Sequence, residues 1–235
     1  MTACLPIPLL LVTVTALIML EERTMPGAPR NIRWVLLWKP LSTLLIILIA
    51  ALSFMQPNHD PGYSTLILVG LILSLAGDVL LIFHAPRAFL VGLVAFLCAH
   101  LAYIAAFIQA QRAFGLSINL MADIIAAVVL ALIGGAMFSV LRPGLGKMRL
   151  PVLLYILVIS TMLHRALSVA FAWRGVAFDA LLMVFGALLF YISDAILAFN
   201  RFRMDNKMPH GRAYNLSTYY AGQLLLALSA VFFML

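Results

Sequence analysis

Long apolar runs, separated by short polar segments, follow one another along the chain. Most of them are about 17 to 25 residues long, the length that a helix needs to cross a bilayer. Their apolar residues are consecutive instead of alternating, which excludes a membrane β-barrel. The pattern predicts an all-α polytopic membrane protein. We expect a single integral membrane domain over residues 1–235 with eight transmembrane helices, at roughly 5–20, 33–55, 63–83, 88–108, 117–141, 150–172, 176–200 and 214–235.

The composition agrees with a membrane protein. Hydrophobic residues make up 65% of the chain and charged residues 10%, and the mean hydropathy is +1.13, which is more apolar surface than a soluble core of this size could bury. Cys4 and Cys98 both lie in apolar runs, so the sequence has neither a disulfide framework nor a cysteine spacing typical of metal sites. We expect the first run to be retained as a span, because it lacks the features of a signal peptide.

Basic residues are distributed unevenly between the two sides of the predicted bundle. Eleven of the fifteen Lys and Arg residues lie in the connections of one side and two in those of the other, while Lys39 and Arg165 lie within spans. By the positive-inside rule the eleven face the cytoplasm, so both termini are predicted to lie outside. This asymmetry explains the formal charge of +7 without a nucleic-acid partner.

Two carboxylates lie inside apolar runs. A charged side chain in a membrane span costs about 2.5 to 3.5 kcal/mol on insertion scales, so Asp78 and Asp194 are candidate site residues. Their surroundings match: Gly77-Asp78-Val-Leu-Leu-Ile-Phe83 is echoed by Ser193-Asp194-Ala-Ile-Leu-Ala-Phe199. With eight spans, the echo predicts a parallel repeat of four helices and a site that pairs the two aspartates.

Other polar residues are expected at a similar depth, in the cytoplasmic half of the membrane. At 1.5 Å per residue, both aspartates and Lys39 lie about 7 to 9 Å from the inner helix ends. The further candidates for substrate binding or for tuning the acids are Tyr155, Tyr219, Tyr220 and Gln223, with His100 and Tyr103 near the middle of the membrane. Structural alternatives stay open: a lysine can snorkel, tyrosines can form an interfacial belt, and a histidine can be a packing residue.

At these residues the sequence resembles the YhhN-like lysoplasmalogenase family, which includes bacterial proteins and animal transmembrane relatives. The matching stretches are Leu73–Leu81, Phe89–Tyr103, Gly186–Phe202 and Thr218–Gln223, with Lys39-Pro40 upstream. His164-Arg165 departs from the family pattern, and we assign Arg165 no role.

The resemblance implies an eight-helix enzyme, here of a bacterial cytoplasmic (inner) membrane. Such an enzyme cleaves the vinyl ether bond of lysoplasmalogens, releasing a fatty aldehyde and glycerophosphoethanolamine or glycerophosphocholine. It also implies that Asp78 and Asp194 are the catalytic pair, with Asn200 among the substrate-binding candidates. The expected partners are a lysophospholipid substrate and membrane lipid, and no cofactor is expected.

The expected chemistry suits two carboxyl groups. A vinyl ether hydrolyses after protonation of its β-carbon, which needs one acid and one carboxylate that stabilises the cation or activates water. Burial and a nearby ammonium change the acidity of a carboxyl group in opposite directions, so Lys39 could divide the two roles.

The sequence is also compatible with two other functions. A proton-coupled transporter of lipids or small molecules would also carry acids and a lysine within its spans. A zinc-dependent lipid hydrolase would use His84, His100 or His164 with the aspartates, although these histidines lack the spacing of a three-ligand site. We therefore expect no metal.

Overall fold

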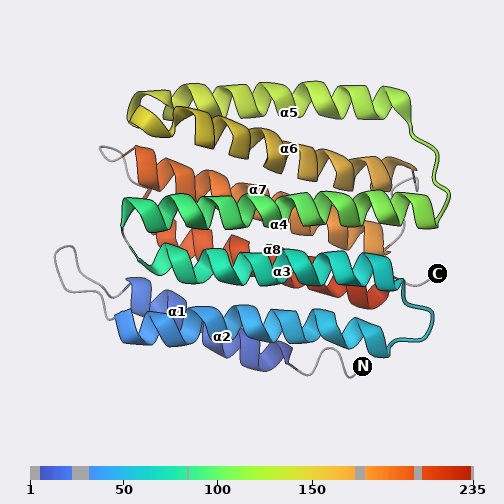
Figure 1. The fold of residues 1–235 in the computed structure, drawn as a ribbon, viewed down its shortest axis with the longest axis horizontal. Helices are drawn as coiled ribbons and strands as arrows, with labels where there is room; N and C mark the ends of the chain where they lie inside the picture. Colours follow the sequence, from blue (N-terminus) through green and yellow to red (C-terminus); the bar gives the residue numbers. More distant parts are fainter. Residues whose placement is uncertain (1–5, 23–31, 84, 173–177, 204–207, 234–235) are drawn as a thin grey trace.

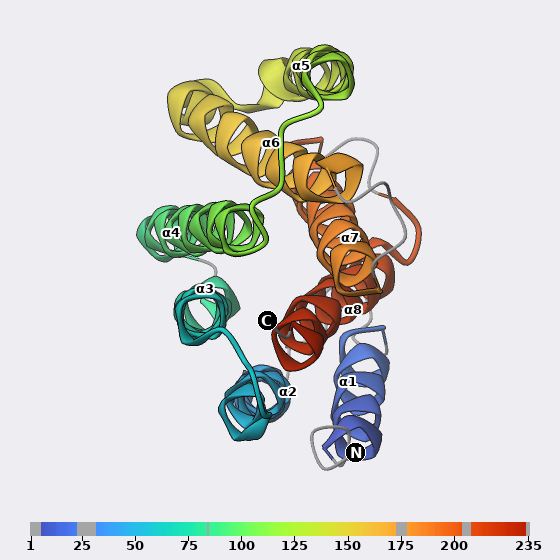
Figure 2. The ribbon, with the colours of Figure 1, turned by 90° about the vertical axis from the view of Figure 1, so that its right-hand side faces the viewer.

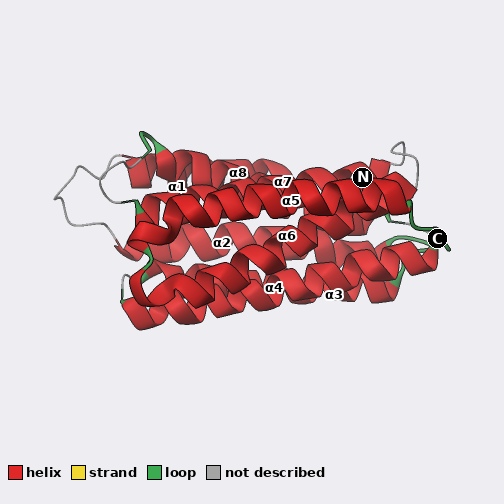
Figure 3. Cartoon of the chain, turned by 90° about the horizontal axis from the view of Figure 1, so that it is seen from above, coloured by secondary structure: helices red, strands yellow, loops and turns green. Residues whose placement is uncertain are grey.

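The computed structural model describes residues 6–22, 32–83, 85–172, 178–203 and 208–233, which form eight α-helices and no β-strand (Figure 3). Cys4 and His84 lie outside the described residues. Short 3-10 helices follow α2 (η2, Leu52–Met55) and connect α5 to α6 (η3, Arg142–Gly144; η4, Gly146–Met148). The α-helices are α1 (Ile7–Glu22), α2 (Ile32–Ala51), α3 (Pro61–Ile82), α4 (Pro86–Ala113), α5 (Leu120–Leu141), α6 (Arg149–Ala172), α7 (Phe178–Phe202) and α8 (Gly211–Phe232).

The helices form one elongated bundle in which successive helices run in opposite directions (Figure 1). Its end view places α8 in the interior, where it packs against α1, α2, α3 and α7 (Figure 2). α5 lies at the edge and packs mainly on α6, while α4 contacts α3 and α6. The end of the bundle at which α3 and α7 finish and α4 and α6 begin is called here the predicted cytoplasmic end.

Polar side chains cap the N-termini of α3 and α5. Asp60 accepts a 2.8 Å hydrogen bond from the backbone N–H of Tyr63, and Pro61 occupies the first helical position, where a missing N–H costs nothing. Asn119 caps α5 by accepting a 3.2 Å bond from the N–H of Ala122. Both helices therefore start where polar loop sequence meets an apolar run.

Six helices, α2 to α7, are long and apolar enough to cross a membrane. α1 has only 16 residues, and α8 carries polar side chains along a buried face. Because α8 packs against four other helices, that polar face meets protein and not lipid. The prediction of an all-α polytopic membrane protein is confirmed. The count of eight spans and the outside location of both termini stay predictions.

Glycines bring two helix pairs into close contact. A Cβ atom at Gly70 of α3 would lie 2.2 Å from the ring of Tyr103 on α4, and one at Gly186 of α7 would lie 3.0 Å from Leu226 on α8. α3–α4 and α7–α8 are the most extensive helix contacts of the bundle. They occupy matching positions in the two proposed four-helix halves, which supports the proposed repeat.

Candidate functional site

Asp78 is the centre of a hydrogen-bonded cluster between α2, α3 and α8. Its Oδ1 lies 3.1 Å from Nζ of Lys39, and its Oδ2 accepts bonds from Thr43 (2.6 Å) and from the hydroxyl of Tyr219 (2.7 Å). Gln223 in turn donates a 2.7 Å bond to the Tyr219 hydroxyl oxygen. Both carboxylate oxygens are thus occupied, and the residue is only 1% exposed. This is a buried ion pair with its remaining acceptor positions satisfied.

Helix periodicity brings these donors together. Lys39 and Thr43 are four residues apart on α2, as are Tyr219 and Gln223 on α8, so each pair lies on one helix face. Tyr220 adds a 3.1 Å bond from its hydroxyl to the backbone carbonyl of Lys39, which ties α8 to α2 at the same level. Thr43 is not among the residues predicted from the sequence, although its spacing of four residues from Lys39 points to it.

Asp194 belongs to a second cluster, between α4, α6 and α7. Its Oδ2 accepts a 2.5 Å hydrogen bond from the hydroxyl of Tyr155 and lies 3.3 Å from Nε2 of His100. The Tyr155 hydroxyl and Nε2 of His100 are 3.5 Å apart. His100 is fully buried, and its Nδ1 has no hydrogen-bond partner among the described residues. Within the same residues, no hydrogen bond involves Oδ1 of Asp194, in contrast to the fully occupied carboxylate of Asp78.

Aromatic rings lie between the two clusters. The Phe190 ring is 4.7 Å from His100 and 5.3 Å from Tyr219, measured between ring centres. Phe96 packs edge to face on both Phe190 and Tyr219. No hydrogen bond or ion pair of the described residues joins Asp78 to Asp194. The structure therefore brings the predicted residues together in two neighbouring groups instead of one shared layer.

The two clusters have a common geometry along the chain. Lys39 and Asp78 are 39 residues apart, and so are Tyr155 and Asp194. In both cases a donor on one helix reaches an aspartate on the next helix, from α2 to α3 and from α6 to α7. This agreement adds to the sequence echo around the aspartates and supports the proposed repeat.

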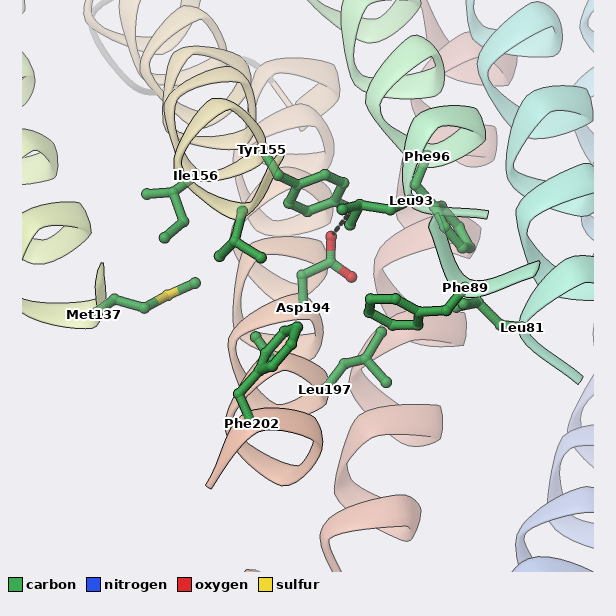
Figure 4. A pocket seen from close by; sticks show the side chains of 12 residues that line it. Leu81, Phe89, Leu93, Phe96, Met137, Tyr155, Ile156, Asp194, Leu197 and Phe202 are labelled. Carbon is green, nitrogen blue, oxygen red and sulfur yellow. Dashed lines mark hydrogen bonds between the residues drawn. The ribbon is translucent and has the colours of Figure 1, made fainter. Parts of the chain in front are cut away.

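A narrow pocket reaches Asp194 but does not include Asp78. Asp194 points into it, with one oxygen directed at Tyr155 and the other turned toward the side of Phe89 (Figure 4). Its free volume is about 30 Å³, which holds about two water molecules, so a lipid chain fits only after the lining side chains move apart. The lining is otherwise apolar and comes from α3, α4, α5, α6 and α7: Leu81, Phe89, Leu93, Phe96, Met137, Val152, Ile156, Leu197, Ala198 and Phe202.

Two predicted site residues lie beside the clusters. Tyr103 is buried at the α3–α4 contact, where its hydroxyl is 3.4 Å from Ser74 and its ring faces His100. Asn200 is at the end of α7, where its side-chain oxygen accepts a 3.0 Å bond from the N–H of Met208. Asn200 thus ties the end of α7 to the residues just before α8.

His164 and Arg165 belong to a polar group at the opposite end of the bundle. His164 bonds the backbone carbonyl of Asp123, and Arg165 donates to Gln111. Ser168 donates a 3.0 Å bond to the Asp123 carboxylate. These contacts join α4, α5 and α6, away from both aspartate clusters. Within the described residues, no three His, Cys, Asp or Glu side chains gather as metal ligands would.

Comparison with known proteins gives a consistent family relationship. Residues 34–230 match the family model described as the YhhN family. The chain is 34% identical to bovine "Lysoplasmalogenase TMEM86A" over 198 residues, covering 82% of this chain and 75% of that protein. It is 36% identical to human "Lysoplasmalogenase TMEM86B" over 187 residues, covering 80% and 72%, and 39% identical to the mouse protein of that name over 171 residues, covering 72% and 66%. No solved structure matches the chain. All four sequence blocks and both aspartates fall within the matched range, and the chain belongs to the YhhN family.

Proposed function

We propose that this protein is a lysoplasmalogenase, a membrane hydrolase that cleaves the vinyl ether bond of lysoplasmalogens. The products are a fatty aldehyde and glycerophosphoethanolamine or glycerophosphocholine. The family relationship supports the reaction class. The observation that carries the assignment of the site is the apolar pocket that holds one carboxyl group, Asp194, between Tyr155 and His100.

Asp194 is the proposed proton donor. Tyr155 donates its hydroxyl hydrogen to Oδ2, so a proton carried by the carboxyl group sits on Oδ1. No described side chain forms a hydrogen bond with Oδ1, and the surrounding walls are apolar. No lysine or arginine within the described residues pairs with Asp194. The acidic proton is therefore available to a substrate carbon in the pocket.

The reaction needs only this carboxyl group and one water. Asp194 gives its proton to the β-carbon of the vinyl ether, and the C=C electron pair forms the new C–H bond. The resulting oxocarbenium ion is stabilised by the carboxylate left behind, as in glycosidases. Water then adds to the cationic carbon and returns a proton to Asp194. The hemiacetal transfers its hydroxyl proton to the glycerol oxygen as the C–O bond breaks, which releases the aldehyde.

Tyr155 and His100 hold the carboxyl group in place and stabilise its charged form. Both contact the same oxygen, Oδ2, so they orient Oδ1 toward the substrate and offset the negative charge after proton transfer. His100 is fixed in turn by the Phe190 ring against its edge.

Asp78 takes a supporting part in this proposal. Its oxygens are occupied by Lys39, Thr43 and Tyr219, so it has no free position for a substrate. Through Tyr219 it fixes the ring that packs on Phe96 and Phe190, next to His100. The acid–base pair expected from the sequence thus becomes one reacting acid and one positioning acid.

The site is proposed to open toward the cytoplasmic half of a bacterial inner membrane. Asp194 lies two turns from the end of α7, and Asp78 one turn from the end of α3, at the predicted cytoplasmic end. Lysophospholipid entering from that leaflet would meet the pocket first.

Aldehyde release by the purified protein tests the proposal. A lysoplasmalogen should be cleaved, whereas its saturated-ether analogue cannot be protonated on carbon and should be inert, and its ester analogue should be a poor substrate. Hydrolysis of the ester at a rate equal to that of the vinyl ether would contradict carbon protonation. We expect full activity after exhaustive chelation, and a loss restored by zinc would point to the metal-dependent alternative.

A further inference from the structure

Arg201 lies at the rim of the pocket. It is in the last turn of α7, is exposed, and its guanidinium carbon lies 4.8 Å from the centre of the Phe89 ring. Phe89 and Phe202 both line the pocket, and their rings meet edge to face with centres 6.0 Å apart. Arg201 therefore lies over Phe89, one of the two aromatic residues that line the pocket at the predicted cytoplasmic end.

Arg201 and Asp194 share one face of α7. They are seven residues apart, which is two helical turns and about 10 Å along the axis. The pocket residues Leu197 and Ala198 lie between them on the same helix. A ligand with a reacting bond at Asp194 and an anionic group toward the membrane surface would contact both residues.

The guanidinium of Arg201 forms no ion pair with the described residues, so its N–H donors are available to a ligand. The described ion pairs use Lys39, His100 and Arg212, and none includes Arg201. Its neighbour Arg203 is engaged differently, because it donates a 3.3 Å bond to the backbone carbonyl of Val140. The planar guanidinium of an arginine presents its N–H donors in a fork that matches a phosphate.

We propose that Arg201 binds the phosphodiester of the lysophospholipid whose vinyl ether is positioned at Asp194. The assignment rests on the proposed function and adds the recognition of the headgroup. The glycerol unit would then lie against Leu197 and Ala198, between the two polar ends of the pocket. Arg201 gives this site affinity for a phosphate-bearing lipid over a neutral lipid with the same vinyl ether.

The kinetic test compares two substrates and two variants. Arg201→Gln should raise KM for a lysoplasmalogen about tenfold or more, since a charge-assisted contact to the phosphate is lost. KM for the neutral 1-alkenylglycerol should stay at the parental value. Arg33→Gln is the matched control, because Arg33 is an exposed arginine in the first turn of α2 that does not line the pocket. Arg33→Gln should leave KM unchanged for both substrates. Equal losses on both substrates, or no loss on either, would overturn the headgroup assignment.

A binding test separates this proposal from the proposed function. A saturated-ether lysophospholipid cannot be cleaved, and it should raise the unfolding temperature of the parent and of Arg33→Gln but not of Arg201→Gln. If the parent releases no aldehyde from either substrate, the proposed function fails, and this binding result alone decides the phosphate site. Equal stabilisation of the parent and Arg201→Gln would refute the site. Stabilisation by inorganic phosphate that matches the lysophospholipid would contradict a lipid headgroup as the ligand.

Discussion

Removing the carboxylate of Asp78 should lower the free energy of unfolding of the protein. It should not remove a group that reacts with the substrate. Asp78→Asn keeps the size of the side chain but leaves the ammonium of Lys39, 3.1 Å away, without its counter-charge. Lys39 has a side chain that is only 13% exposed, so water replaces the lost partner poorly. Breaking a buried ion pair in this way costs about 3 to 5 kcal/mol.

The second half of this prediction concerns the double variant. Lys39→Met removes the charge that Asp78→Asn leaves behind, while Thr43 and Tyr219 can still bond the amide. Replacing both charges is often close to neutral, so the double variant should recover most of the lost stability. The two changes are therefore expected to be strongly non-additive.

Thermal unfolding of the purified variants in detergent measures the effect. For a chain of this size the single change corresponds to a fall in Tm of about 6 to 20 °C. Asp179→Asn is a matched control, because this buried aspartate bonds the backbone N–H of Ala180 and forms no ion pair with the described lysines and arginines. Asp179→Asn should lower Tm by less than Asp78→Asn does. Parental stability of Asp78→Asn, or purely additive losses in the double variant, would refute the role given to the pair.

Two further predictions concern the pocket. Tyr155→Phe removes the 2.5 Å bond to Asp194 and should lower kcat about tenfold while Tm stays near the parental value; an unchanged kcat would contradict the positioning role. Ala198→Phe fills a pocket with only about 30 Å³ of free volume and should raise KM for a lysoplasmalogen at least tenfold, whereas a parental KM would mean that the substrate binds elsewhere.

The fold class followed from hydrophobic runs because bilayer thickness fixes the length of a span. The predicted runs agree with the helices in order and approximate position. Helix ends were less accurate: α4 continues to Ala113, five residues past its predicted end, since the Gln and Arg residues there still favour a helix. The hydrophobic pattern does not show which helices pack against each other. Neither the contact of α4 with α6 nor the interior position of α8 could be predicted from it.

The sequence identified most of the site residues as candidates. It did not show which of them contact Asp78 and which contact Asp194. Intramembrane carboxylates are costly, so Asp78 and Asp194 were identifiable from the sequence alone. Depth estimates placed both at one level, but they contain no information on the rotation of each helix about its axis. The pairing of Asp78 with Lys39, and of Asp194 with Tyr155 and His100, follows from that rotation. Phe96 and Phe190, which lie between the clusters, resemble any other apolar residue in the sequence.

The rate of aldehyde release by Asp194→Asn, measured beside the parent on a lysoplasmalogen, tests the central assignment most directly. Asparagine keeps the shape of the side chain and an acceptor for Tyr155, but it has no proton to give to carbon. We predict that Asp194→Asn folds like the parent and loses a factor of about 10² to 10⁴ in kcat, the usual contribution of a positioned acid. Near-parental turnover by well-folded Asp194→Asn would contradict the assignment of Asp194 as the proton donor.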